Sequence, residues 1–141
     1  GTVSLKNGDH SLVFEYRSAR ATVKPKMSNG RIVLNIGLNV RGALSELTGD
    51  TNLLKQPDTE EIEQMLEEQI IFEMSSAVSK LRQYETDALN FGGAVRRSYP
   101  KEWKEMEGNW ECEFREMEIN YDVNVTLRRF GVTTDTIVEE E

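Results

Sequence analysis

The chain has 141 residues, 38% of them hydrophobic and 30% charged, a composition typical of one folded domain rather than of a disordered tail. Its formal net charge of −8 argues against a nucleic-acid binder, because phosphate binding requires clustered lysines and arginines. The sequence contains no apolar run near the roughly 20 residues that a membrane-spanning helix needs, so we expect the chain to be soluble.

We expect one central domain between two ends of different character. The chain begins at Gly1 without an initiator methionine, and we interpret it as a fragment of a longer protein. Residues 1–10 are expected to be a flexible lead, residues 11–131 a single α+β domain, and residues 132–141 an acidic tail.

A β-hairpin is predicted around Asn29-Gly30, a residue pair preferred in two-residue type I′ turns because both positions need a positive φ. With Ser28 opposite Arg31, five apolar pairs share one face: Met27 with Ile32, Pro25 with Leu34, Val23 with Ile36, Ala21 with Leu38 and Ala19 with Val40. Pro25 lacks an N–H, so its strand is expected to lie at the edge of a sheet there.

A long amphipathic helix is predicted to follow a loop over residues 48–57. Asp58 and Glu61 occupy the two positions of a capping box. Apolar residues then recur three or four positions apart, at Ile62, Leu66, Ile70, Met74, Ala77, Leu81, Tyr84 and Ala88. Gly92-Gly93 is expected to stop or kink this helix, and Pro100 to open a short helical turn over residues 101–106.

The last strand is predicted from strict alternation over residues 117–127. Its apolar residues are Met117, Ile119, Tyr121, Val123, Val125 and Leu127, and the residues between them are polar. The whole pattern predicts an α+β fold, an antiparallel sheet of about four strands with one long amphipathic helix packed on its apolar face.

Little in the sequence points to catalysis. His10 and Cys112 are the single histidine and cysteine, too far apart in the chain to favour a zinc site. Nucleophile, phosphate-loop and dinucleotide motifs are absent. The many carboxylates are expected on water-exposed faces, which disfavours a carboxylate-based hydrolase. We therefore expect no enzyme activity, no metal and no cofactor.

One segment, residues 83–114, is rich in aromatic residues. We single out Asp87, Phe91, Tyr99, Trp103 and Trp110 as candidate partner-binding residues, because tryptophan and tyrosine dominate interface hot spots. The alternative is an aromatic plug that closes the end between the helix and the sheet. For Asp87, a cap on a turn near Asn90 and Phe91 is favoured over exposure to a partner.

The same segment resembles the Ger(x)C family, the C subunits of spore germinant receptors. The run from Gln83 to Gly92 is similar to the end of that family's long helix. Its "P-x-x-W … W … F" pattern is matched by Pro100, Trp103, Trp110 and Phe114, and its closing strand by a segment ending at Gly131. At residues 88–90 this chain departs from the family, whose members are usually more apolar at these positions.

The resemblance implies the C-terminal domain of a lipoprotein, anchored by an acylated cysteine to the outer face of the spore inner membrane. The anchoring cysteine would lie upstream of this chain, so Cys112 is not a candidate for it. The implied partners are an integral-membrane A subunit and a permease-like B subunit. The implied function is non-catalytic assembly or signalling of the nutrient receptor, with a small-ligand (nutrient) sensing domain as the alternative.

Overall fold

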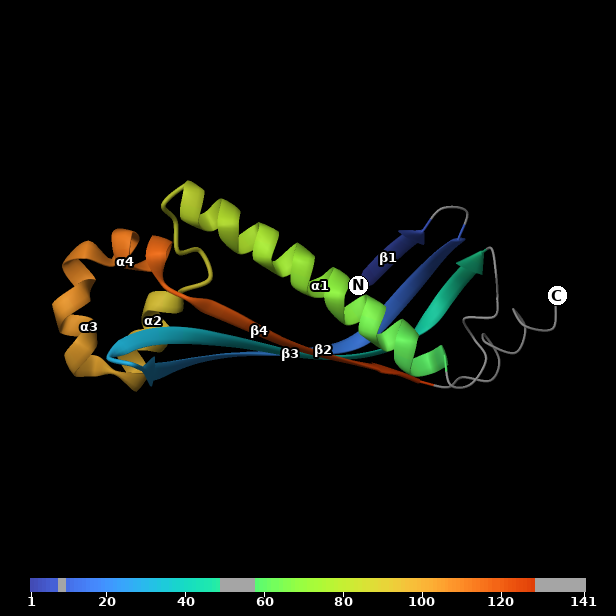
Figure 1. The fold of residues 1–141 in the computed structure, drawn as a ribbon, viewed down its shortest axis with the longest axis horizontal. Coiled ribbons are helices and arrows are strands. Elements are labelled where there is room, and N and C mark those ends of the chain that lie inside the picture. Colours follow the sequence, from blue (N-terminus) through green and yellow to red (C-terminus); the bar gives the residue numbers. More distant parts are fainter. Residues whose placement is uncertain (8–9, 49–57, 129–141) are drawn as a thin grey trace. The chain divides into compact units, whose positions relative to one another are not determined.

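The computed structural model describes residues 1–7, 10–48 and 58–128 (Figure 1). Its elements in chain order are β1 (Thr2–Asn7), β2 (His10–Ser28), β3 (Arg31–Thr48), α1 (Asp58–Gln83), α2 (Phe91–Ser98), α3 (Pro100–Met106), the 3-10 turn η2 (Glu107–Asn109), α4 (Trp110–Glu116) and β4 (Ile119–Leu127). The strands form one sheet in the order β1-β2-β3-β4, which confirms the predicted α+β class and strand number.

The predicted hairpin is confirmed in its turn and its strand ends, although Ala19, Ala21 and Met27 of its predicted apolar face are exposed. β2 ends at Ser28 and β3 begins at Arg31, and the turn residues Asn29 and Gly30 have φ values of 50° and 77°. Near Pro25, β2 is an edge of the sheet, because β1 pairs only with the part of β2 from His10 to Glu15. Alternation and turn chemistry therefore determine this part of the fold locally.

The expectation of a flexible lead over residues 1–10 is wrong for residues 2–7, which form strand β1. β1 pairs antiparallel with β2, with Val3 opposite Phe14 and Leu5 opposite Leu12. Val3 is 6% exposed, so this short strand contributes to the core. This strand is hard to predict from the sequence, because six residues with only two large apolar side chains give a weak period-two signal.

β4 runs in the same direction as β3, so the sheet is mixed rather than antiparallel throughout. The Leu34 N–H donates to the Glu118 carbonyl at 3.0 Å, and the Asn120 side chain donates to Asn35, so residue numbers rise together along the two strands. Parallel neighbours need a long crossover, and here the helices between β3 and β4 supply it.

The chain divides into two compact units, each with its own buried residues. Unit 1 consists of Gly1–Arg20, Leu38–Ile71 and Val123–Glu141, and unit 2 of Ala21–Gly37 and Phe72–Asp122. Among the described residues of unit 1, the buried apolar ones are Val3, Leu12, Phe14, Val40, Leu44, Ile62, Leu66, Ile70, Val123 and Val125.

Two glutamates of α1 are not simply solvated, contrary to the expectation for the acidic face of the helix. Within unit 1, the Glu67 carboxylate accepts the N–H of Val125, and the Glu63 carboxylate accepts the N–H of Leu127, both at 2.9 Å. β4 is the last strand of the sheet, so these bonds occupy outward N–H groups of an edge strand.

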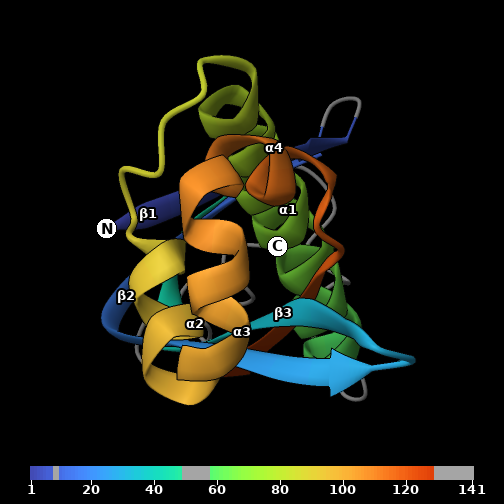
Figure 2. The ribbon, with the colours of Figure 1, turned by 90° about the vertical axis from the view of Figure 1, so that its left-hand side faces the viewer.

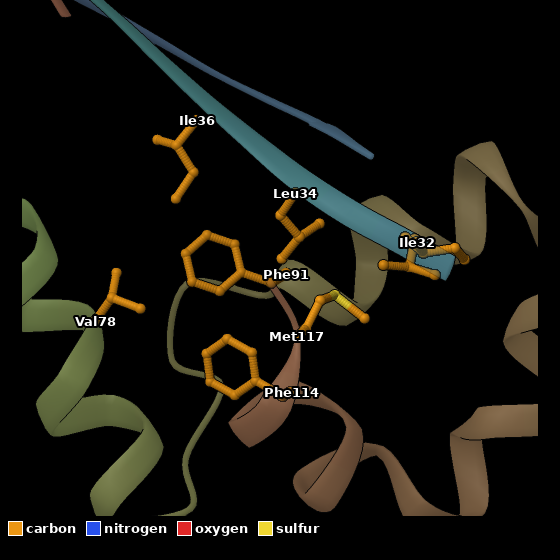
Figure 3. Packing of buried hydrophobic residues seen from close by; sticks show 8 residues of the cluster. Ile32, Leu34, Ile36, Val78, Phe91, Phe114 and Met117 are labelled. Carbon is orange, nitrogen blue, oxygen red and sulfur yellow. The ribbon is translucent and has the colours of Figure 1, made fainter. Parts of the chain in front are cut away.

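The core of unit 2 joins the hairpin, the end of α1 and the short helices (Figure 3). β3 contributes Ile32, Leu34 and Ile36, and α1 contributes Val78, with Leu34 fully buried. The predicted stripe of α1 passes through Val78 rather than Ala77, which is exposed. The remaining buried members come from α2, α4 and the residue after α4: Phe91, Val95, Phe114 and Met117.

Some expectations fall on residues that the structure does not describe. Thr48 belongs to β3, and the rest of the predicted loop over residues 48–57 lies outside the described part of the chain, as does the acidic tail over residues 132–141. Among the described residues, no helix combines the length and apolar character needed to cross a membrane.

Candidate functional site

Helix α1 ends at Gln83, one turn before the predicted stripe does, and the chain enters a loop of residues 84–90 that we call the Asp87 loop. The N–H of Thr86 donates to the Leu81 carbonyl at 2.9 Å and the N–H of Glu85 to the Arg82 carbonyl at 3.2 Å. Glu85 has a φ of 53°. This is the hydrogen-bond pattern of a Schellman motif, with a glutamate in the left-handed position that glycine usually takes. The glycine pair predicted to end the helix lies further on.

Asp87 ties the loop to the start of α2. Its Oδ1 accepts the N–H of Phe91 at 2.7 Å and its Oδ2 accepts the N–H of Gly92 at 2.7 Å. Oδ2 also accepts the indole N–H of Trp110 at 3.0 Å. The cap favoured from the sequence is therefore confirmed, and it includes a third donor that sequence spacing could not indicate. Charged acceptors make the stronger hydrogen bonds, so one carboxylate holds three segments together.

Asn90 completes this junction as the N-cap of α2. It adopts the left-handed conformation with a φ of 57°, which asparagine tolerates better than most residues, and its Oδ1 accepts the N–H of Gly93 at 3.1 Å. Gly92-Gly93 thus begins a helix instead of ending one. A Cβ added to Gly92 would lie 2.9 Å from Trp103 Cη2 and 3.1 Å from Trp110 Nε1, so the indoles leave room for glycine only.

Four rings pack beside Asp87, and we call them the aromatic cluster: Phe91, Trp103, Trp110 and Phe114. The centroids of Trp103 and Trp110 lie 5.2 Å apart, edge to face, and those of Trp110 and Phe114 lie 5.7 Å apart, stacked. Phe91 and Phe114 are each 2% exposed, with centroids 5.5 Å apart, and Figure 3 shows them between Val78 and β3. The cluster belongs to the core of unit 2.

The structure brings the five predicted site residues into one neighbourhood, but in different roles. Asp87, Phe91, Trp103 and Trp110 touch one another directly or through Gly92. Tyr99 packs on the same core, and its hydroxyl accepts the N–H of Met27 at the hairpin tip at 3.0 Å. Tyr99, Trp103 and Trp110 are half-buried, whereas Phe91 is inaccessible to a partner.

Arg82 is a further member of this site, and its position in the sequence does not indicate it. Its guanidinium donates to the Met117 carbonyl and lies over the Phe114 ring, 5.5 Å from the centroid. Burial lowers the pKa of Arg82, and the nearby Tyr121 partly offsets that shift. A basic residue in the last turn of a helix is usually a surface residue, so only the fold reveals this packing.

Two large apolar side chains flank Asp87 and remain exposed. Tyr84 is 72% exposed and Leu89 is 63% exposed, although the sequence had placed Tyr84 on the buried stripe of the helix. Glu85, beside Tyr84, forms an ion pair with Arg115 of α4 at 2.8 Å. The Asp87 loop is therefore held on its inner side by a carboxylate and presents apolar groups on its outer side.

At this site the Asp87 carboxylate supports the loop through hydrogen bonds. Both Asp87 oxygens accept N–H donors. Across the part of the chain that the structure describes, no group of three or more histidine, cysteine or acidic residues could hold a metal ion. Cys112 is exposed in α4.

These observations define a class of protein, an α+β domain with a surface loop that is fixed by hydrogen bonds and an ion pair. Residues 1–131 match the family "Spore germination B3/GerAC like, C-terminal", and the chain therefore belongs to this family. Among curated relatives it is 24% identical over 133 residues to spore germination protein B3 and 28% identical over 114 residues to spore germination protein KC, both of Bacillus subtilis (strain 168).

The match covers 93% and 80% of this chain but only 36% and 28% of those two relatives. The chain thus spans about a third of their length. A crystal structure of the GerBC protein resembles the fold with a TM-score of 0.78 and 24% identity, over 90% of this chain and 40% of that one. The relatives' names refer to spore germination and not to a chemical reaction.

Proposed function

We propose that this chain is a non-catalytic C-terminal domain of a spore germination receptor subunit, which contributes to the assembly or signalling of the receptor. Membership of the germination family supports a role in spore germination. The protein that carries this domain would be a lipoprotein at the outer face of the spore inner membrane, with its lipid anchor upstream of this chain. Its partners would be an integral-membrane A subunit and a permease-like B subunit.

The observation that carries the proposal is the exposure of Tyr84 and Leu89 on a loop that is otherwise firmly bonded. Large apolar side chains that stay exposed beside a packed core are candidates for a partner interface. A loop fixed before binding loses little conformational entropy when it docks, which favours affinity. The three hydrogen bonds to Asp87 and the ion pair of Glu85 supply that fixation.

In this proposal the five candidate residues predicted from the sequence divide into two roles. Asp87 and Phe91 position the loop from within, because Phe91 is buried and Asp87 faces three donors. Tyr99, Trp103 and Trp110 are half-buried, so each retains surface that a partner could contact. Tyr84 and Leu89 make the main contacts.

The test replaces Tyr84 and Leu89 by serine in the full-length protein, in spores. Both side chains are exposed, so the variant should fold and accumulate normally. We expect a lower level of the assembled receptor and slower nutrient germination. The matched control is Phe72→Ser, which removes a 65% exposed ring from α1 and should leave both unchanged. Normal receptor level and germination in the Tyr84 and Leu89 double variant would rule out this surface.

A further inference from the structure

An open groove lies within unit 2, between the tip of the β2–β3 hairpin and helices α3 and α4. Its volume is about 940 Å³. Figure 2 shows α2 and α3 beside the hairpin. The groove does not include the Asp87 loop, so it is a different surface from the one proposed above.

The groove is strongly acidic. Its fourteen lining residues include five glutamates, Glu102, Glu105, Glu113, Glu116 and Glu118, and the one basic residue Arg31. The formal charge of the lining is therefore 1 − 5 = −4. Helix α3 supplies two of these carboxylates and α4 supplies two more. A partner that carries positive charge complements a surface of this sign.

None of the four helix glutamates of the groove has an ion-pair partner among the described residues. These four are Glu102, Glu105, Glu113 and Glu116, whereas Glu85, outside the groove, pairs with Arg115. Glu118 accepts a hydrogen bond from the neutral Asn120 side chain. The acidic side chains are therefore available to a partner.

Apolar side chains lie among the acids. Two methionines line the groove, Met27, which is 41% exposed, and half-buried Met106 of α3. Methionine is flexible and adapts to varied apolar partners. Acids beside exposed methionine suit lysine or arginine, whose apolar stems pack on methionine while the charged heads reach carboxylates.

We propose that this groove docks a cationic peptide segment of a partner protein, one that combines lysine or arginine with apolar residues. Small-molecule sites are typically concave, mostly apolar and have few charges, whereas this groove is open and distributes its acids over two helices and the segment between α4 and β4. An extended segment can contact several separated carboxylates at once. The inference goes beyond the proposed function, because it concerns a second surface and a defined partner chemistry.

The test measures binding of a short synthetic peptide of alternating lysine and leucine to the chain, by ¹H–¹⁵N chemical shifts. We expect shifts at the groove, in the turn residues Asn29 and Gly30 and in α3. The triple variant E105Q/E113Q/E116Q should bind at least about tenfold more weakly, and raised salt should weaken the wild type. All three side chains are exposed, so glutamine should leave the fold intact.

The matched control is E60Q/E61Q/E68Q, which removes three exposed glutamates of α1 and the same total charge. It should bind the peptide like the wild type. Equal weakening by both triple variants would mean attraction to net charge alone and would overturn the proposal. It is also overturned if the peptide does not bind, if the shifts lie outside the groove, or if free L-lysine binds as tightly as the peptide.

Discussion

Replacing Asp87 by alanine should destabilise unit 2 by about 3–4 kcal/mol. The change leaves the N–H groups of Phe91 and Gly92 without an acceptor, and both residues are buried. Each buried donor without a partner costs about 1–3 kcal/mol, so the two together cost about 4 kcal/mol at the middle of that range. Trp110 is half-buried, so water can replace its bond at little cost.

The assay is urea unfolding followed by tryptophan fluorescence, because both tryptophans of the chain lie in unit 2. Asp122→Ala is the matched control, since it removes an exposed aspartate of β4 and should change the free energy of unfolding by less than about 0.5 kcal/mol. A loss below about 1 kcal/mol for Asp87→Ala would refute the argument that this carboxylate holds the loop.

Three further outcomes test individual contacts. Gly92→Ala should destabilise the protein by about 1–3 kcal/mol in urea unfolding, because the new Cβ would lie 2.9 Å from the nearest indole atom. The control Gly108→Ala places its Cβ where no atom lies within 4 Å, so it should be neutral or slightly stabilising. Burial raises the pKa of Tyr121, and nearby Arg82 partly offsets the shift. The folded pKa lies above the unfolded value of about 10, so the contribution of Tyr121 to the free energy of unfolding is intact below about pH 10 and is lost as pH rises through the folded pKa. The urea midpoint of Tyr121→Phe should therefore fall less than that of the wild type as pH rises above about 10. Glu67→Ala should accelerate hydrogen exchange at the Val125 amide, which loses its acceptor, and an unchanged rate would contradict that hydrogen bond.

The elements that the sequence predicts well are those with a local physical cause. Asn29-Gly30 determines both the turn and the register of the hairpin, and burial of Ile32 and Leu34 follows from the alternation. β4 was predicted from the same period of two, which places Val123 and Val125 in the core. Alternation does not report strand direction, however, so the parallel pairing with β3 was missed.

The remaining errors come from contacts between distant residues. The end of α1 could not be predicted because Glu85, not glycine, takes the left-handed position there. Helices α2 and α4 have eight and seven residues, too few to display a helical period. Residue types and spacing indicated the aromatic segment as a candidate site and Asp87 as a cap, and the cap is confirmed. The sequence did not indicate which members of the segment are exposed, as Tyr84 and Leu89 are, and which are buried, as Phe91 and Phe114 are.

The most direct test of the central claim is site-specific photocrosslinking from the Asp87 loop. A photoreactive amino acid replaces Tyr84 in the full-length protein, spore inner membranes are irradiated, and the crosslinked partners are identified by mass spectrometry. The account predicts crosslinks to an integral-membrane receptor subunit from position 84 and none from position 72 of α1. Equal crosslinking from both positions, or no receptor subunit crosslinked from position 84, would contradict the claim that this loop docks a partner.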